Sequence, residues 1–153
     1  MINLLKLISF CLLTLLVFSC KMKKNSQTTS TVEKHEGKEQ YPQAIIGEFS
    51  KSNAPYKILS VKLQRNYLEI EVSYSGGCEQ HEFNLIGSKY LSKSLPPIRN
   101  VQLVHLDKQD KCKSIVTEKL KFSISSLAEN TNPGNKIKLQ IEGFKDMIEY
   151  SYE

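Results

Sequence analysis

Apolar and polar side chains alternate along much of this sequence from about Ala44 onward. In LEIEVSY, residues 68–74, every second side chain is apolar and those between are Glu or Ser. The same period of two recurs in KILSVKL (57–63), LKFSI (120–124), IKLQI (137–141) and IEYSY (148–152). Successive side chains of a strand point to opposite faces, whereas a helix repeats about every 3.6 residues, so the pattern predicts half-buried strands. In residues 57–63 it places Leu59, Val61 and Leu63 on one face.

Three further segments have the composition of strands but a weaker pattern: AIIGEF (44–49), HEFNLI (81–86) and NVQLVHL (100–106), the last with apolar residues on both faces. Turn-forming Gly, Pro and Asn residues separate the segments, and only SSLAEN (125–130) predicts a short helical turn. About seven or eight short strands joined in this way predict an all-β domain. We expect a small antiparallel β-sandwich, immunoglobulin-like in arrangement, or a barrel.

The first twenty residues have the pattern of a secretory signal. A short basic start, residues 1–6, precedes a mainly apolar run over residues 7–18. A run of about twelve residues is too short to cross a hydrocarbon core about 30 Å thick, which needs about twenty residues in a helix. It has the length of the apolar part of a signal peptide, so residues 1–19 are predicted to be removed.

The end of that run resembles the lipobox of bacterial lipoproteins. Val17 stands three residues before Cys20, and the small residue Ser19 directly precedes it. The resemblance implies that Cys20 becomes the acylated first residue of a mature lipoprotein, held in the cell-envelope membrane by its lipid and facing the periplasm or the surface. The alternative is an uncleaved membrane anchor, since Lys21, Lys23 and Lys24 follow the apolar run.

The segment behind Cys20 is polar and rich in Lys, Ser, Thr and Glu. Such a segment buries too little apolar area to offset its conformational entropy, so residues 20–43 are predicted to form a lipidated cysteine with a flexible tether, followed by the β-domain at 44–153. The net charge of the chain is +5, but its basic residues are dispersed rather than clustered. We therefore expect no nucleic-acid partner.

Two cysteines remain in the mature domain, Cys78 and Cys112. An even pair in an oxidising compartment predicts a disulfide bond. Closing a loop of about 35 residues stabilises a domain by roughly 3 to 4 kcal/mol in the chain-entropy model. Gly76 and Gly77 would allow the backbone to turn sharply before the bridge.

Two other chemistries are open to these cysteines. Cys78, His81, His105 and Cys112 together offer two thiolates and two imidazoles, a set that could bind Zn²⁺ or a copper ion. The long spacing between His105 and Cys112 weighs against this alternative. Cys78 could also act as a nucleophile with His81 as its base, but residues three apart on an extended chain point to opposite faces.

Motifs of the common enzyme classes are absent from the sequence: it contains no G-x-S-x-G, no P-loop, no G-x-G-x-x-G and no H-E-x-x-H. We therefore expect a protein that is not an enzyme and needs no cofactor. The sequence predicts an envelope lipoprotein whose β-sandwich acts by non-catalytic binding or structural contact with an envelope protein or glycan. A metal-binding lipoprotein that uses the two cysteines and two histidines is the alternative.

Overall fold

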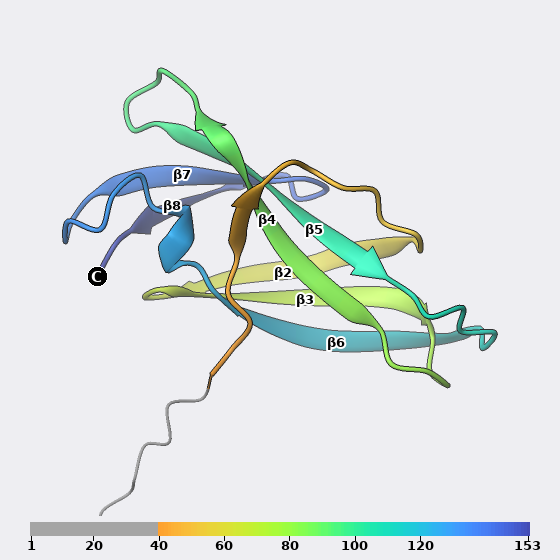
Figure 1. The fold of residues 1–153 in the computed structure, drawn as a ribbon. Coiled ribbons are helices and arrows are strands. Elements are labelled where there is room, and N and C mark those ends of the chain that lie inside the picture. Colours follow the sequence, from red (N-terminus) through yellow and green to blue (C-terminus); the bar gives the residue numbers. More distant parts are fainter. Residues whose placement is uncertain (1–39) are drawn as a thin grey trace, which may run out of the picture. The chain divides into compact units, whose positions relative to one another are not determined.

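The structure, a computed structural model, describes residues 40–153. These residues form eight strands and one short 3₁₀ helix, η2, at Ser125–Leu127 (Figure 1). The strands are β1 (Ile45–Gly47), β2 (Tyr56–Gln64), β3 (Tyr67–Gly76), β4 (Glu82–Leu91), β5 (Ile98–Leu106), β6 (Ser114–Ser123), β7 (Lys136–Ile141) and β8 (Met147–Ser151). The predicted signal peptide, Cys20 and most of the predicted tether lie outside the described residues.

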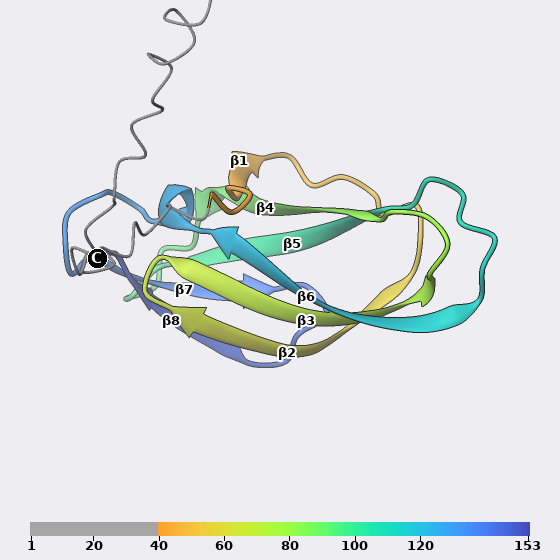
Figure 2. The same ribbon diagram turned by 90° about the horizontal axis from the view of Figure 1, so that it is seen from below.

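Two sheets form a sandwich. One has the strand order β1-β4-β5-β7-β8 and the other β2-β3-β6, and over residues 40–153 they do not close into a barrel (Figures 1 and 2). The prediction of an all-β sandwich is confirmed. No helix in this part of the chain is long and apolar enough to cross a membrane.

Two strand pairings depart from the antiparallel pattern that the sequence predicts, since β1 pairs with β4 and β5 pairs with β7 in parallel. Parallel neighbours need a crossover connection rather than a tight turn. Here the other sheet supplies it, because β2 and β3 lie between β1 and β4 in the chain, and β6 lies between β5 and β7. The alternation of apolar and polar side chains within a strand does not indicate which strands are neighbours in a sheet.

The core lies between the two sheets and follows the predicted alternation in most strands. Leu68, Ile70 and Val72 on β3 are fully buried, as are the three apolar residues of β7. Apolar area removed from water contributes roughly 25 cal/mol per Å², so these facing strands carry much of the fold's stability.

Strand β2 is an exception, because Leu59 is 44% exposed while Ile58 is buried. Ile58 pairs with Val72 and Ser60 with Glu71, so Leu59 is the extra residue of a β-bulge. A bulge shifts the alternation by one residue, which reverses the faces on its two sides. The prediction that Leu59 shares a face with Val61 and Leu63 was therefore wrong.

Strand β5 is apolar on both faces because part of its outer face is also covered. Val104, on the outer face, is 2% exposed. The connection from β1 to β2 reaches β5, where the Ser50 amide donates to Gln102 Oε1 at 3.1 Å and the Asn53 amide donates to the His105 carbonyl at 3.1 Å. This connection also builds the pocket described below.

Arg99 on β5 is buried, at 5% exposed, and bonds main-chain carbonyls. Its Nε donates to Leu127 at 2.7 Å, its Nη1 to Ser88 at 2.6 Å and its Nη2 to Ala128 at 3.4 Å. Burial lowers the pKa of the guanidinium. The side chain joins the end of β4 to η2 and the residue after it.

Candidate functional site

The predicted disulfide is present between Cys78 and Cys112, whose Cα atoms are 5.8 Å apart. It joins the β3–β4 connection to the β5–β6 connection. Gly77, next to Cys78, has φ +109°, a conformation that favours glycine. The expected glycine turn before the bridge is confirmed at Gly77, whereas Gly76 is the last residue of β3 and does not adopt this conformation.

The two predicted histidines meet beside this bridge. His81 Nδ1 and His105 Nε2 are 2.7 Å apart, and the two rings stack with centroids at 4.9 Å. His81 Nε2 lies 3.3 Å from Asp110 Oδ2. All three side chains are at most 1% exposed, so they form a buried chain of ionisable groups.

Sequence reasoning missed Asp110, which lies in the charged loop before Cys112. Its carboxylate accepts main-chain N–H bonds from Cys112 at 2.8 Å, Cys78 at 2.9 Å and Glu79 at 3.1 Å. These bonds stabilise the ionised carboxylate and hold the pKa of Asp110 far below its ordinary value, and the bond from Cys112 has the largest effect. The ionised carboxylate thus binds both arms of the disulfide, and nothing in an isolated loop sequence reveals such distant partners.

The hydrogen-bond chain fixes where protons can sit. With His81 neutral, its Nε2–H donates to Asp110 and its Nδ1 accepts from His105 Nε2–H. In that arrangement His105 Nδ1 carries no proton, and it has no hydrogen bond of ordinary geometry among the described residues. Burial, and after it the neighbouring His81 ring, lowers the pKa of His105, while the main-chain carbonyls of Ala54 and Pro55 partly oppose the shift. Burial therefore disfavours a charge on His105.

Aromatic rings enclose the histidines. Phe83 stacks on His105 with centroids 4.3 Å apart and an interplanar angle of 6°, and Tyr74 and Tyr56 contact the same ring at 5.0 and 5.9 Å. A Cβ at Gly76 would lie 2.5 Å from His81 Nε2, so only glycine leaves room for that ring. The cluster is a packed, hydrogen-bonded link between loops.

We expect the free energy of unfolding to fall as pH drops below about 6.5, the ordinary pKa of histidine. Because the pKa of His105 is lowered in the folded state, the unfolded chain binds more protons below that value, and stability rises with pH by up to about 1.4 kcal/mol per unit. The groups facing the ring are His81, Asp107, Tyr56 and Tyr74. Urea unfolding from pH 7.5 to 5 measures the slope. In His105→Gln, whose amide can still donate to His81, the slope should be smaller; an equal slope would contradict this assignment.

The alternative metal set is brought together by the fold, but not as four free ligands. The two sulfurs are bonded to each other, and His81 presents opposite ring nitrogens to His105 and Asp110. The Cys78 and Cys112 sulfurs and an Asp110 oxygen do lie within 4.8 Å of one another. Metal binding would require the sulfurs to be reduced, so it stays a prediction for the reduced protein. The same bond leaves Cys78 no thiolate to serve as a nucleophile.

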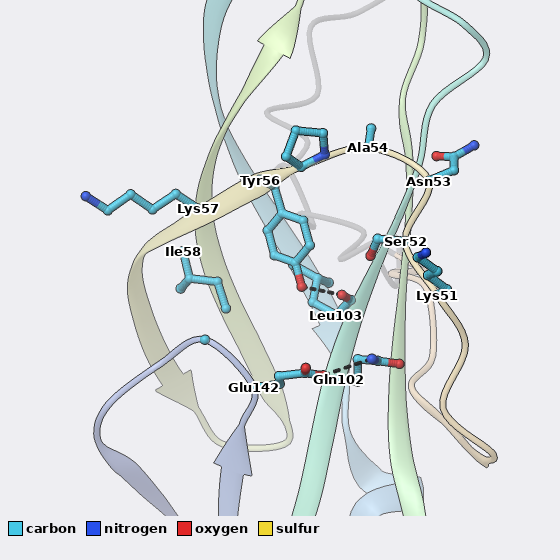
Figure 3. A pocket seen from close by; sticks show the side chains of 12 residues that line it. Lys51, Ser52, Asn53, Ala54, Tyr56, Lys57, Ile58, Gln102, Leu103 and Glu142 are labelled. Carbon is cyan, nitrogen blue, oxygen red and sulfur yellow. Dashed lines mark hydrogen bonds between the residues drawn. The ribbon is translucent and has the colours of Figure 1, made fainter.

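A pocket of about 630 Å³ opens next to this cluster and is lined by the start of β2, the connection before it, β5 and the β7–β8 turn (Figure 3). Its polar side chains include Lys51, Ser52, Asn53, Gln102 and Glu142. Gln102 Nε2 donates to Glu142 Oε2 at 2.8 Å. Sequence reasoning did not predict this pocket, because its residues come from three separate segments.

The pocket exists because β5 changes neighbours along its length. Its pairing with β7 ends at Val101 opposite Ile141, and the connection before β2 bonds β5 next at His105. Leu103 lies between, and its carbonyl accepts the Tyr56 hydroxyl. Burial, and after it the charge of Glu142, raises the pKa of Tyr56, so this hydroxyl stays a donor. Tyr56 thus lines the pocket and also contacts the buried His105 ring.

Comparison with known proteins identifies the class of domain. The model of the NigD-like C-terminal β-sandwich domain matches residues 42–152, and the chain belongs to this family. The strand and turn patterns of the sequence do not identify it. No curated protein matches the sequence.

The chain resembles several solved structures of bacterial proteins. A NigD-like immunity protein from Bacteroides caccae ATCC 43185 has a TM-score of 0.56 and 20% sequence identity, and the match covers 74% of this chain and 64% of that one. A protein of unknown function, DUF1344, from Bacteroides vulgatus ATCC 8482 has a TM-score of 0.46 and 17% identity, with 74% and 58% covered. The chain thus spans less than two thirds of either structure.

Proposed function

We propose that this protein is a lipid-anchored binding protein of the bacterial cell envelope, which recognises a protein or glycan through its β-sandwich and catalyses no reaction. Cys20 would carry the lipid, and the membrane would be one partner. The observation that carries the proposal is the open pocket beside β5, whose rim is held in place by hydrogen bonds to β5.

The side chains of the pocket suit recognition. The Gln102 amide and the Glu142 carboxylate form one hydrogen-bonded polar pair, and Lys51 adds a charged group at the rim. Ser52 and Asn53 hold this rim in place, since Ser52 accepts from the His105 amide and Asn53 bonds both main-chain groups of Asp107. Pockets with a few fixed polar groups orient a ligand by hydrogen bonds. Catalysis would need an ionisable pair that reaches the ligand, whereas His81, His105 and Asp110 are buried and bond one another.

A photo-crosslinking residue in the rim of the pocket should capture the partner. With a photo-crosslinking amino acid at Lys51, irradiated cells should yield an adduct that a Gln102→Ala/Glu142→Ala background weakens at least severalfold. The control is the same amino acid at Thr131, in the connection between η2 and β7 at the other end of the sandwich (Figure 1). Mass spectrometry identifies the adduct. Equal adducts at both positions, or none at Lys51, would refute recognition at the pocket.

The anchor is tested separately with Cys20→Ala. We expect this change to abolish incorporation of a labelled fatty acid and to move the protein out of the membrane fraction, because the lipid alone would hold the domain there. Cys11→Ala, within the predicted signal, is the matched control and should keep both properties. Undiminished labelling of the Cys20→Ala protein would exclude the lipoprotein assignment.

An immunity role would be one form of partner binding. The Bacteroides caccae structure that shares this fold is described as an immunity protein. The photo-crosslinked adduct distinguishes the two proposed partner classes directly, since it contains either a protein or a glycan.

A further inference from the structure

Strand β6 forms a margin of the three-stranded sheet (Figure 1). It runs over Ser114–Ser123 and pairs with β3 along its whole length. On its other side, among residues 40–153, the main chain is paired at one end only: the Ala44 amide donates to the Ser123 carbonyl at 2.8 Å, and the Ser123 amide donates to Pro42 at 2.9 Å. This edge therefore already accepts an extended segment, in parallel.

The direction of the Ser123 bonds fixes which main-chain groups face the edge. Alternate residues of a strand point their N–H and C=O groups to the same side. Ile115, Thr117, Lys119 and Lys121 therefore present their main-chain groups away from β3, as Ser123 does. The remainder of the edge is a template on which a further strand can form main-chain bonds.

The charges of the sheet indicate which strand would fit. In register across the outer face, Lys62 of β2 lies opposite Glu69 of β3, which lies opposite Lys121 of β6. Glu71 of β3 lies likewise opposite Lys119 of β6. Opposite charges on neighbouring strands are favourable and like charges are unfavourable. The place beside Lys121 is taken by the chain itself, because its Nζ lies 4.3 Å from the centroid of the Tyr41 ring and donates to the Tyr41 hydroxyl at 3.3 Å. A fourth strand continues the charge order of the sheet if it places an acidic residue beside Lys119.

The far end of the edge is apolar. Ile115 is 77% exposed and shares its outward face with Thr117 and the two lysines. A single exposed isoleucine is ordinary on a protein surface. On a strand edge it adds a preference for an apolar or β-branched residue in the facing position.

We propose that the edge of β6 from Ile115 to Lys119, which no main-chain segment among residues 40–153 pairs with, binds an extended acidic segment of a partner protein by strand addition. An acidic residue of that segment faces Lys119, and an apolar residue faces Ile115. The surface is separate from the pocket at β5 and requires neither the lipid nor the pocket side chains. A second copy of this chain fits less well, because the outward residues of its β6 are Ile, Thr, Lys and Lys and bring no carboxylate.

The test uses the full chain in detergent and an acetylated, amidated nonapeptide that alternates Glu with Thr and Val. We expect the peptide to bind and to slow hydrogen exchange at the Ile115, Thr117 and Lys119 amides. The same peptide with Lys in place of Glu is the control and should bind at least tenfold more weakly. Equal binding of both peptides would overturn the proposal.

Substitutions test whether the peptide binds at the β6 edge or elsewhere on the surface. Lys119→Gln should weaken peptide binding severalfold, whereas the matched change Lys62→Gln on β2, on the same outer face, should leave it unchanged. Thr117→Pro removes an N–H that faces the edge and spares the bonds to β3, so it should abolish binding while the unfolding midpoint stays similar. Gln102→Ala, in the pocket, should have no effect, which keeps this proposal distinct from the pocket.

Other occupants of the edge give different results. Slow exchange of the same amides without peptide would assign the edge to the chain's own segment before residue 40. Self-association that Thr117→Pro abolishes, without peptide binding, would assign it to a second copy. Either result overturns the proposal.

Discussion

Replacing Arg99 by methionine is expected to lower the free energy of unfolding by about 2 to 4 kcal/mol. The guanidinium is buried and donates to the carbonyls of Leu127, Ser88 and Ala128. Methionine fills much of the volume but leaves these carbonyls without their donor, and each unpaired buried group costs about 1 to 3 kcal/mol. Relief of the buried charge offsets part of this loss, because the same burial lowers the pKa of the arginine.

Guanidinium-chloride unfolding of the two proteins measures the difference. Lys136→Met is the matched control, since Lys136 is exposed and its ion pair with Glu149 at 3.3 Å lies at the surface. That pair should contribute less than about 1 kcal/mol. If Arg99→Met costs no more than Lys136→Met, then η2 and the end of β4 do not depend on the arginine.

Removing the disulfide is expected to lower the free energy of unfolding by about as much as Arg99→Met does. The double change Cys78→Ser/Cys112→Ser should lower the free energy of unfolding by roughly 3 to 4 kcal/mol, because the bridge closes a loop with a sequence separation of 34. The loss comes largely from greater freedom of the unfolded chain. Urea unfolding under non-reducing conditions measures it.

A reductant supplies the control for this pair of substitutions. The wild-type protein treated with a phosphine reductant should approach the stability of the double variant, whereas the variant itself should not respond. Asp110→Asn, which keeps the bridge but weakens the bonds to both of its arms, should be less stable than wild type and still respond to the reductant. A wild-type protein that is insensitive to reduction would show that the bridge contributes nothing to stability.

Strands could be predicted from the sequence where one face of the strand is buried, because apolar and polar side chains then alternate along it. The segments in β3, β7 and β8 show a period of two because one face packs against the other sheet. The bulge at Leu59 was not predictable, since one extra residue changes no composition. The parallel pairings were likewise hidden, because strand order depends on contacts between distant segments.

The candidate sites also include one feature that the sequence predicts and two that it does not. Residue type and compartment were sufficient to predict the bond between Cys78 and Cys112. The role of Asp110 depends on main-chain amides more than thirty residues away. The pocket depends on the place where β5 changes its neighbour, which appears only once the sheet is assembled.

The bridge also sets how far this domain can be stretched. Cys78 and Cys112 lie just beyond the Gly76–Ser114 pair, so the chain leaves and re-enters the smaller sheet at one covalently closed point. Tension applied between the termini passes through the sulfur bond and cannot extend β4 and β5. The oxidised domain therefore releases roughly 110 Å less length on forced unfolding than the reduced one, counting about 3.3 Å for each of the 34 intervening steps.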